Sequence, residues 1–403
     1  MKSELDIDRH VEEINSWLIN KRRDFHQHPE LANKETRTSK KIIESLEKLG
    51  LEVKKDLGKN STGVTGLIKG KNKNKTIGLR VDMDALEIKE ETDLSFASNN
   101  SGIMHACGHD AHTTIGLGVA NVLMKIKDQL NGNVKIIFQP AEEDGPHGGG
   151  ARPMIKDGVL EDPKVDALLG LHIWPELMLG QVGTKKGPIT ASSDPFTIKV
   201  TGKETHGAYP HLGIDSVLVG SNIVNNIHTI ISRNIDPFET AIISIGVIKS
   251  GNQFNIISKQ TTIEGTVRTF DEKVRNLISE KIKNIAKNTS KSFGAKCNIK
   301  YIYANPPVIN NGLLVDLAKE AIENSLGKDN FISIDRPAVI GEDFAHFTKR
   351  VPSTFLFIGY NEKNREVSPL HSCSLNFNEK LLSIGTKTCI NVILNWINNY
   401  NNS

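Results

Sequence analysis

The stretch TIGLRVDMDAL, residues 76 to 86, predicts the fold, because it is a short apolar run that ends among carboxylates. Three further runs of this kind follow along the chain: VKIIFQP at 134–140, DALLGLHIW at 166–174 and STFLFIGY at 353–360. Short apolar runs separated by helical segments are typical of buried parallel strands. The sequence therefore predicts an α/β domain with a central, mostly parallel sheet flanked by helices.

Polar side chains gather at or just after the carboxyl ends of these runs. They are Asp82, Glu142, Glu143 and His172. Open α/β sheets bind their ligands at that edge, in the crevice outside the strand ends. We therefore expect the functional site there.

The pattern changes between residues 188 and 304. Strand, helix, strand, strand, helix and strand follow one another in PFTIKVTG, DSVLVGSNIVNNIHTIISR, TAIISIGVI, TTIEGTVRTF, EKVRNLISEKIKNIAKNTSKSFG and CNIKYIY. This β-α-β-β-α-β order is the ferredoxin-like signature. We therefore predict a discontinuous catalytic domain over residues 1–187 and 305–403, with an inserted satellite domain over residues 188–304.

Length and charge narrow the class of protein. The 403 residues fit two or three domains, and 38% hydrophobic residues can bury a core in each. With 50 Lys and Arg against 47 Asp and Glu, the net charge of +3 favours neither a nucleic-acid partner nor a polybasic membrane contact. The segment MKSELDIDRHVEEINSW resembles neither a signal peptide nor a membrane span, so we expect a cytoplasmic protein.

The motif HACGHDAHTT, at residues 105–114, predicts a metal site together with IIFQPAEED further along. Cys107 and His109 stand two apart, so in an extended segment their side chains share a face and can bind one ion or two adjacent ions. Glu142 and Glu143 are consecutive and must point differently, so one can hold metal while the other transfers protons. This division of labour is what metal-assisted hydrolysis requires.

Nine motifs in order resemble the M20 metallopeptidase family, specifically its amidohydrolase branch of aminoacylases, hippurate hydrolases and auxin-conjugate hydrolases. They are FHQHPEL (25–31), RVDMDAL (80–86), MHACGHDAHTT (104–114), FQPAEE (138–143), GLHIWPEL (170–177), THGAYPHLGIDS (205–216), GTVRTF (265–270), GEDFA (341–345) and LHS (370–372). The resemblance implies metal-dependent hydrolysis of the amide bond of an N-acyl amino acid to a carboxylic acid and a free amino acid.

The resemblance also implies a two-metal centre in each subunit. The implied ligands are Cys107, His109, Glu143, His172 and His371. Glu142 is the implied general base and acid. A soft sulfur ligand favours zinc, cobalt or nickel over magnesium, and the resemblance adds manganese, so the sequence leaves the ion open among these four. Spacing alone does not exclude His105 and His112 as ligands.

Other roles follow from the resemblance alone. Asp82 matches the family's aspartate beside the metals, where it would orient a ligand or the base, and Asp110 could act similarly. For both residues the alternative is an ordinary aspartate at the end of a strand.

In the satellite domain, His206 resembles the histidine that family members aim at the substrate carbonyl, often across a dimer interface. We therefore expect a homodimer through the satellite domain, which would also act as a lid. Asn255 and Arg268 match positions that hold the substrate carboxylate, and their alternative is a surface role on two strands.

Three loops depart from the family pattern: Glu87 follows DAL in place of proline, NIIS stands at 255–258, and Cys373 follows the LHS motif. None of these removes an implied ligand or the base, so they bear on substrate preference. Two alternatives stay open. One is a dipeptidase or carboxypeptidase of the same family, and the other is a catalytically inactive binding protein on this fold.

Overall fold

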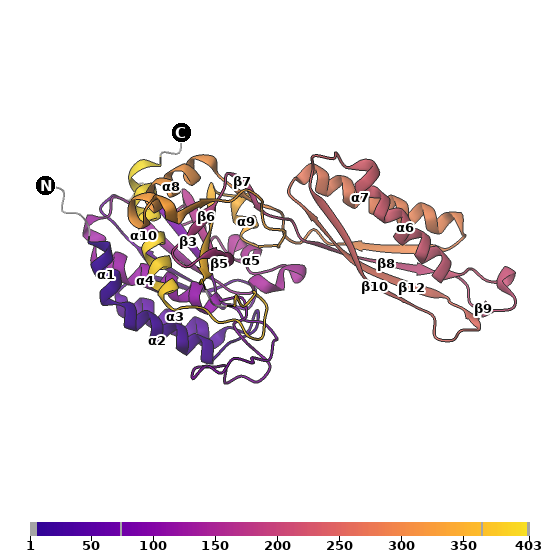
Figure 1. Ribbon diagram of the computed structural model, residues 1–403, viewed down its shortest axis with the longest axis horizontal. Coiled ribbons are helices and arrows are strands. Elements are labelled where there is room, and N and C mark those ends of the chain that lie inside the picture. The colour runs from indigo at the N-terminus through magenta and orange to yellow at the C-terminus, as the bar shows by residue number, and fades with distance from the viewer. Residues whose placement is uncertain (1–5, 73–74, 364–365, 401–403) are drawn as a thin grey trace. The chain divides into compact units, whose positions relative to one another are not determined.

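The computed structural model describes residues 6–72, 75–363 and 366–400, and the chain divides into two compact units (Figure 1). The first, called here the catalytic unit, comprises Met1–Ile189, Val308–Arg336 and Asp343–Ser403. The second, the satellite unit, comprises Thr190–Pro307 and Pro337–Glu342. The catalytic unit is therefore discontinuous, as predicted. The chain enters the satellite unit a second time at Pro337–Glu342. This segment has no periodic sequence pattern from which that could be predicted.

An eight-stranded sheet forms the centre of the catalytic unit, in the order β1-β2-β4-β3-β5-β16-β6-β15. Its strands are β1 (Glu52–Leu57), β2 (Gly63–Ile68), β3 (Thr76–Asp82), β4 (Asn133–Gln139), β5 (Ala167–Met178), β6 (Val182–Thr184), β15 (Phe331–Ser333) and β16 (Ser353–Asn361). The four central strands β4, β3, β5 and β16 are parallel. Strands β3 and β4 are buried along their whole length, as both faces of a covered parallel sheet must be.

Helices cover both faces of this sheet. They are α1 (Ile7–Glu13), α2 (Asn15–Gln27), α3 (Thr36–Leu49), α4 (His109–Lys125), α5 (Ala151–Lys156), α8 (Gly312–Leu326), α9 (Ala345–Thr348) and α10 (Lys380–Asn399). Leu356 and Ile358 of β16 belong to the core shared with α4 and α10. Phe355, which directly precedes Leu356 on β16, meets Phe344 at the start of α9 with ring centroids 5.1 Å apart. Because side chains alternate across a strand, α9 covers the opposite face.

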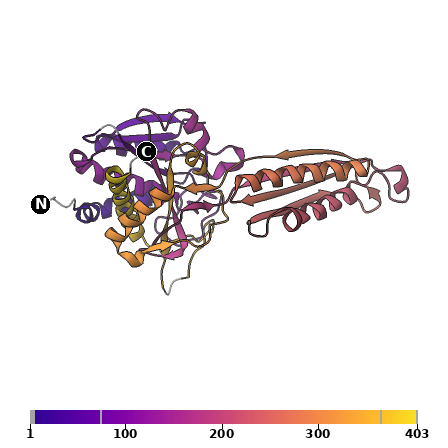
Figure 2. The same ribbon diagram turned by 90° about the horizontal axis from the view of Figure 1, so that it is seen from above.

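The satellite unit has the predicted ferredoxin-like topology. Its elements are β8 (Asp194–Thr201), α6 (Ser216–Asn234), β10 (Ala241–Ser250), β12 (Gln260–Thr269), α7 (Glu272–Ser292) and β13 (Lys296–Tyr301). The strands pair antiparallel in the order β10-β12-β8-β13. Both helices lie side by side along the sheet, and Figure 2 shows the pair. Apolar residues at helical spacing on α6 (Ile223, Ile227, Ile230) build the core with Ile198 and Val200 of β8.

Two short strand pairs and a 3₁₀ turn also belong to the described part of the chain. Strands β9 (Thr205–His206) and β11 (Ile256–Ile257) pair with each other, as do β7 (Gly187–Thr190) and β14 (Val308–Asn310). The 3₁₀ turn η2 (Glu142–His147) follows β4. Within the described ranges, no helix combines the length and the apolar character that crossing a membrane would need.

Candidate metal centre

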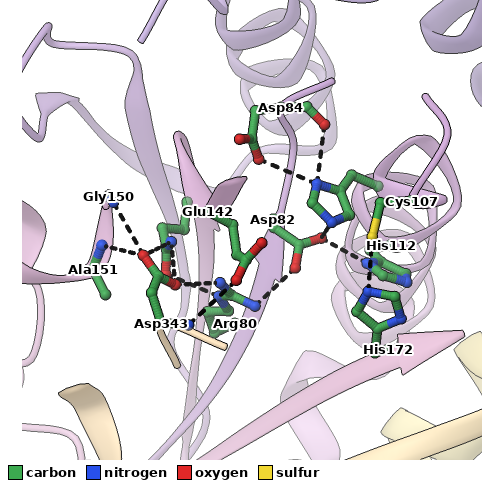
Figure 3. Close-up of polar contacts among 12 residues, drawn as sticks. Arg80, Asp82, Asp84, Cys107, His112, Glu142, Gly150, Ala151, His172 and Asp343 are labelled. Carbon is green, nitrogen blue, oxygen red and sulfur yellow. Dashed lines mark hydrogen bonds and ion pairs between the residues drawn. The ribbon is translucent and has the colours of Figure 1, made fainter. Parts of the chain in front are cut away.

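Of the predicted site residues of the catalytic unit, Figure 3 labels Asp82, Cys107, Glu142 and His172. Asp82 ends β3, Glu142 begins η2 after β4, and His172 lies on β5. Helix α4 begins at His109, directly after Gly108, which has a left-handed φ of 82°. A Cβ at Gly108 would lie 2.3 Å from Ile173 Cδ1, so only glycine fits this turn.

Five residues with metal-binding side chains converge in two overlapping groups. The ligand atoms of Cys107, His109 and His172 lie within 4.8 Å of one another, and so do those of Cys107, Glu143 and His371. Cys107 Sγ is 3.3 Å from His172 Nε2, and His371 Nε2 is 3.2 Å from Glu143 Oε1. The structure thus brings together all five residues that the sequence singled out, with the cysteine common to both groups.

The orientations of the two buried histidines fit a cation. His172 Nδ1 donates to the Ile173 carbonyl at 2.7 Å, which leaves the lone pair of Nε2 facing Cys107. His109 Nδ1 lies 3.1 Å from Asp84 Oδ1, while its buried Nε2 has no hydrogen-bond partner among the described residues. A buried nitrogen without a partner is costly, and a metal ion would satisfy it.

The electrostatics of the site also favour a cation. Burial and the carboxylates of Glu143 and Glu142 raise the pKa of the Cys107 thiol well above its ordinary value. Although burial opposes it, the carboxylates of Asp82 and Asp84 raise the pKa of His109 to about 10. Burial and negative charge thus keep Cys107 protonated, and negative charge keeps His109 protonated. A divalent ion supplies the missing positive charge and displaces these protons on binding.

The other two histidines of the motif differ from these ligand candidates. His112 lies near Asp82 and His109, but both of its ring nitrogens are engaged. Its Nδ1 is 2.6 Å from Asp82 Oδ1, and its Nε2 accepts from the Ile173 N–H at 3.0 Å. His105 is buried and belongs to no metal-ligating group of the described residues. Burial lowers the pKa of His105 to about 3, so this ring is neutral.

Two aspartates of the RVDMDAL motif, Asp82 and Asp84, contact the histidines of the site and the residues around them. Asp82 accepts from Arg80 Nη1 at 2.8 Å and contacts His112, and its Oδ1 is 3.8 Å from His109 Nε2. Asp84 contacts His109 through Oδ1 and accepts the Glu143 N–H through Oδ2 at 3.0 Å. Asp84 thus orients two ligand candidates at once. The sequence analysis did not single out Asp84. Its position two residues after Asp82, on the same side of an extended segment, could have indicated this role.

Asp110, in the first turn of α4, links this helix to α2. Its Oδ2 accepts from Arg22 Nε and lies near His26 Nδ1, both at 2.8 Å. All three side chains are buried. Although burial opposes it, the Arg22 guanidinium and His26 hold the pKa of Asp110 far below its ordinary value. This charge cluster fixes the turn that presents Cys107 and needs no metal contact of its own.

Glu142, the predicted base, lies beside the candidate ligands. Its carboxylate is within 4.8 Å of ligand atoms of His109 and Glu143. The side chain is 8% exposed, and its Oε1 accepts from the Asp343 N–H at 3.3 Å. Asp343 is itself held by Arg80 Nη2 at 2.8 Å. A carboxylate in this position can reach a water molecule next to a bound cation.

The satellite unit groups its predicted residues in two places. His206 on β9 is opposite Ile256, and the Gly207 N–H donates to the Asn255 carbonyl at 2.7 Å, so His206 and Asn255 are neighbours. Both are exposed. Arg268 is half-buried near the other end of β12, which begins at Gln260. Eight residues of strand span roughly 26 Å, so this unit does not bring Arg268 to Asn255.

Fold and site together define a hydrolase built from an α/β unit with a candidate two-metal centre and a ferredoxin-like satellite unit. Residues 78–395 match peptidase family M20/M25/M40, and the chain belongs to this family. The family assignment from the nine motifs is thereby confirmed.

Three similar proteins illustrate the range of the family. Thermostable carboxypeptidase 1 of Saccharolobus solfataricus is 41% identical over 377 residues, 93% of this chain and 94% of that protein. The N-acetyl-L-cysteine deacetylase of Bacillus subtilis is 39% identical over 347 residues, 86% of this chain and 81% of that protein. A crystal structure of the Bacillus subtilis YXEP protein, described as a dinuclear metal binding peptidase, superposes with a TM-score of 0.81 at 33% identity, over 95% of this chain and 98% of that one.

Proposed function

We propose that the protein hydrolyses the amide bond of N-acyl amino acids with the help of two divalent metal ions. The observation that carries this proposal is the convergence of five metal-binding side chains beside a separate buried carboxylate, Glu142. If Glu142 stays free of metal while the other five side chains bind it, its carboxylate can transfer protons within the centre, as hydrolysis requires. Relatives named as N-acetyl-L-cysteine deacetylase and N-acyl-L-amino acid amidohydrolase support the N-acyl substrate class.

The ions would be held by a mixed sulfur, nitrogen and oxygen set. The proposed ligands are Cys107, His109, Glu143, His172 and His371. When bound, the pair supplies Lewis-acid activation of water and of the scissile carbonyl. The thiolate favours zinc, cobalt or nickel by softness, and manganese remains a fourth candidate.

The side chains and backbone of the protein transfer the protons and orient the ligands. Glu142 takes a proton from the attacking water and passes it to the leaving amine, for which its reach to the centre is suitable. Asp343 steadies the Glu142 carboxylate through its backbone N–H. Asp84 keeps the His109 proton on Nδ1 and so leaves Nε2 as the ligating atom. Asp82 sets the tautomer of His112 and lies next to His109.

A carboxypeptidase or dipeptidase is the second candidate, and the 41% identical thermostable carboxypeptidase 1 favours it. The two candidates differ in the acyl group, which carries a free ammonium only in a dipeptide. We expect N-acetyl and N-benzoyl amino acids to be cleaved with at least tenfold higher kcat/KM than dipeptides that share the same C-terminal residue. Release of the free amino acid measures both. Cleavage of dipeptides alone would favour the second candidate, and tight binding without any turnover would favour an inactive binding protein.

We further propose that two subunits complete each site. His206 and Asn255 are neighbours on the β9–β11 pair, which precedes β12 in the chain, whereas Arg268 lies roughly 26 Å along β12 from its first residue, Gln260. An amino acid is far smaller than this separation, so one satellite unit cannot present both groups to a single substrate. If His206 acts on the carbonyl and Arg268 on the carboxylate, they come from different subunits of a homodimer.

Mixing two inactive variants tests this arrangement. In a mixed dimer of His206→Ala and Glu142→Gln, one site would combine an intact Glu142 with an intact His206 from the partner. We expect activity to reappear on mixing under subunit exchange, up to about a quarter of the wild-type rate when half of the dimers are mixed. Co-expression with two different affinity tags isolates the mixed dimer. An active monomer in sedimentation, or a mixed dimer as inactive as its parents, would contradict the shared site.

A further inference from the structure

The turn that carries Glu142 has an unusual backbone. Ala141, the residue before it, has a φ of 55°, in the left-handed region that side chains with a Cβ disfavour. A residue other than glycine adopts this conformation only at a steric cost, because its Cβ approaches the following carbonyl oxygen. Contacts around the turn must therefore hold it, and the direction of the Glu142 side chain depends on them.

One such contact comes from Glu35, just before α3. Its Oε1 accepts the Ala141 N–H at 2.8 Å and the Asn33 N–H at 2.9 Å. Its Oε2 accepts from Thr62 Oγ1 at 3.0 Å. The Glu35 side chain is fully buried, at 0% exposed. A buried carboxyl group is costly, and here its acceptor positions are used by groups from three separate segments.

The other side of the turn is held in the same way. The Glu143 N–H donates to Asp84 Oδ2 at 3.0 Å. The residues before and after Glu142, Ala141 and Glu143, therefore both donate their backbone N–H groups to buried carboxyl groups. Asp84 also contacts His109, whereas the side-chain hydrogen bonds of Glu35 within the described ranges go to Asn33, Thr62 and Ala141, none of which is a proposed metal ligand.

We propose that Glu35 is a positioning residue for the hydrolytic reaction, which holds the left-handed turn at Ala141 and thereby aims Glu142 at the reacting water. The inference rests on the proposed role of Glu142 as the base. What matters is an acceptor atom in the place of Oε1. The negative charge of the carboxylate is not required.

Protonation of Glu35 leaves this function intact. Burial and the nearby Asp84 carboxylate raise the pKa of Glu35 to about 7, so both forms are present at neutral pH. A proton on Oε2 can be donated to Thr62 Oγ1, while Oε1 goes on accepting from Ala141. A glutamine can copy this arrangement, with its carbonyl in place of Oε1 and its amide directed at Thr62.

A pair of conservative variants separates acceptor position from charge. Glu35→Gln keeps the acceptor and removes the charge, whereas Glu35→Asp keeps the charge and withdraws the acceptor by one methylene. We expect Glu35→Gln to retain kcat within about threefold. Glu35→Asp should lose at least tenfold in kcat at unchanged KM and metal content, because displacing a catalytic group by about 1 Å can cost on the order of 10²-fold. Thr62→Val, which removes the Oε2 contact and leaves the Ala141 contact in place, is the matched control and should keep the wild-type kcat even if it lowers stability.

Amide hydrogen exchange supplies a readout that does not depend on substrate. The Ala141 N–H should exchange faster in Glu35→Asp than in wild type, and at the wild-type rate in Glu35→Gln. If Glu35→Asp only lowers the melting temperature and leaves kcat unchanged, or if Glu35→Gln is the more damaged variant, the inference is wrong. Wild-type protein that cleaves no N-acyl amino acid yet shows the expected exchange pattern would overturn the proposed function and leave the role of Glu35 in the turn intact.

Discussion

Glu142→Gln is expected to lower kcat on the order of 10²- to 10⁴-fold while leaving two metal ions bound per subunit. The amide is nearly the same size as the carboxylate and can still accept the Asp343 N–H, so the turn should keep its shape. It cannot take a proton from water at neutral pH, and removal of a general base has a cost of this size. Steady-state kinetics and elemental analysis of the same preparation measure the two effects.

The matched control for this variant is Glu161→Gln, at an exposed position on the same unit. It should keep both turnover and metal content. Near wild-type turnover by Glu142→Gln at full metal occupancy would remove Glu142 from the chemistry. Loss of metal together with activity would instead make Glu142 a ligand.

Cys107→Ala is expected to lose metal first and activity as a consequence. Cys107 belongs to both ligand groups, so its removal weakens both positions of a two-metal centre. The remaining histidine and glutamate side chains form incomplete sets, and bound metal should fall below one equivalent after dialysis. Elemental analysis against protein concentration gives the stoichiometry.

Cys297→Ala is the control for the loss of a thiol, because Cys297 lies on β13 of the satellite unit. It should bind two ions like wild type. An unchanged stoichiometry in Cys107→Ala would exclude the cysteine from the ligand set. Activity restored by excess metal alone would show that the thiolate contributes affinity and no chemistry.

The sequence predicted the parts of this protein in which local pattern and tertiary structure agree. The four parallel central strands are each a short segment rich in apolar residues, and the satellite unit has a regular order of strands and helices. The edge strands β6 and β15 have only three residues each, too few for a periodic signal. Short elements of this kind are stabilised by their neighbours in the sheet, which a single sequence does not show.

Within the site, motif spacing found the candidate ligands but not the residues that support them. The role of His112 depends on the Ile173 N–H, 61 residues away in the chain. Glu35 accepts a hydrogen bond from Ala141, which is 106 residues away in the chain. An alanine in the sequence does not indicate a left-handed φ. The separation of Arg268 from Asn255 follows from the length of β12 and from strand pairing. Sequence motifs alone give neither of these. Such contacts between distant segments become visible only in the folded chain.

The most direct test of the central claim is a metal titration of chelator-stripped protein, with release of free amino acid from an N-acetyl amino acid as the signal. Zinc, manganese, cobalt and nickel are added in separate experiments. We predict no release without metal, followed by a rise that levels off at two equivalents per subunit for at least one of the four ions. The same rate before and after complete removal of metal would contradict the account.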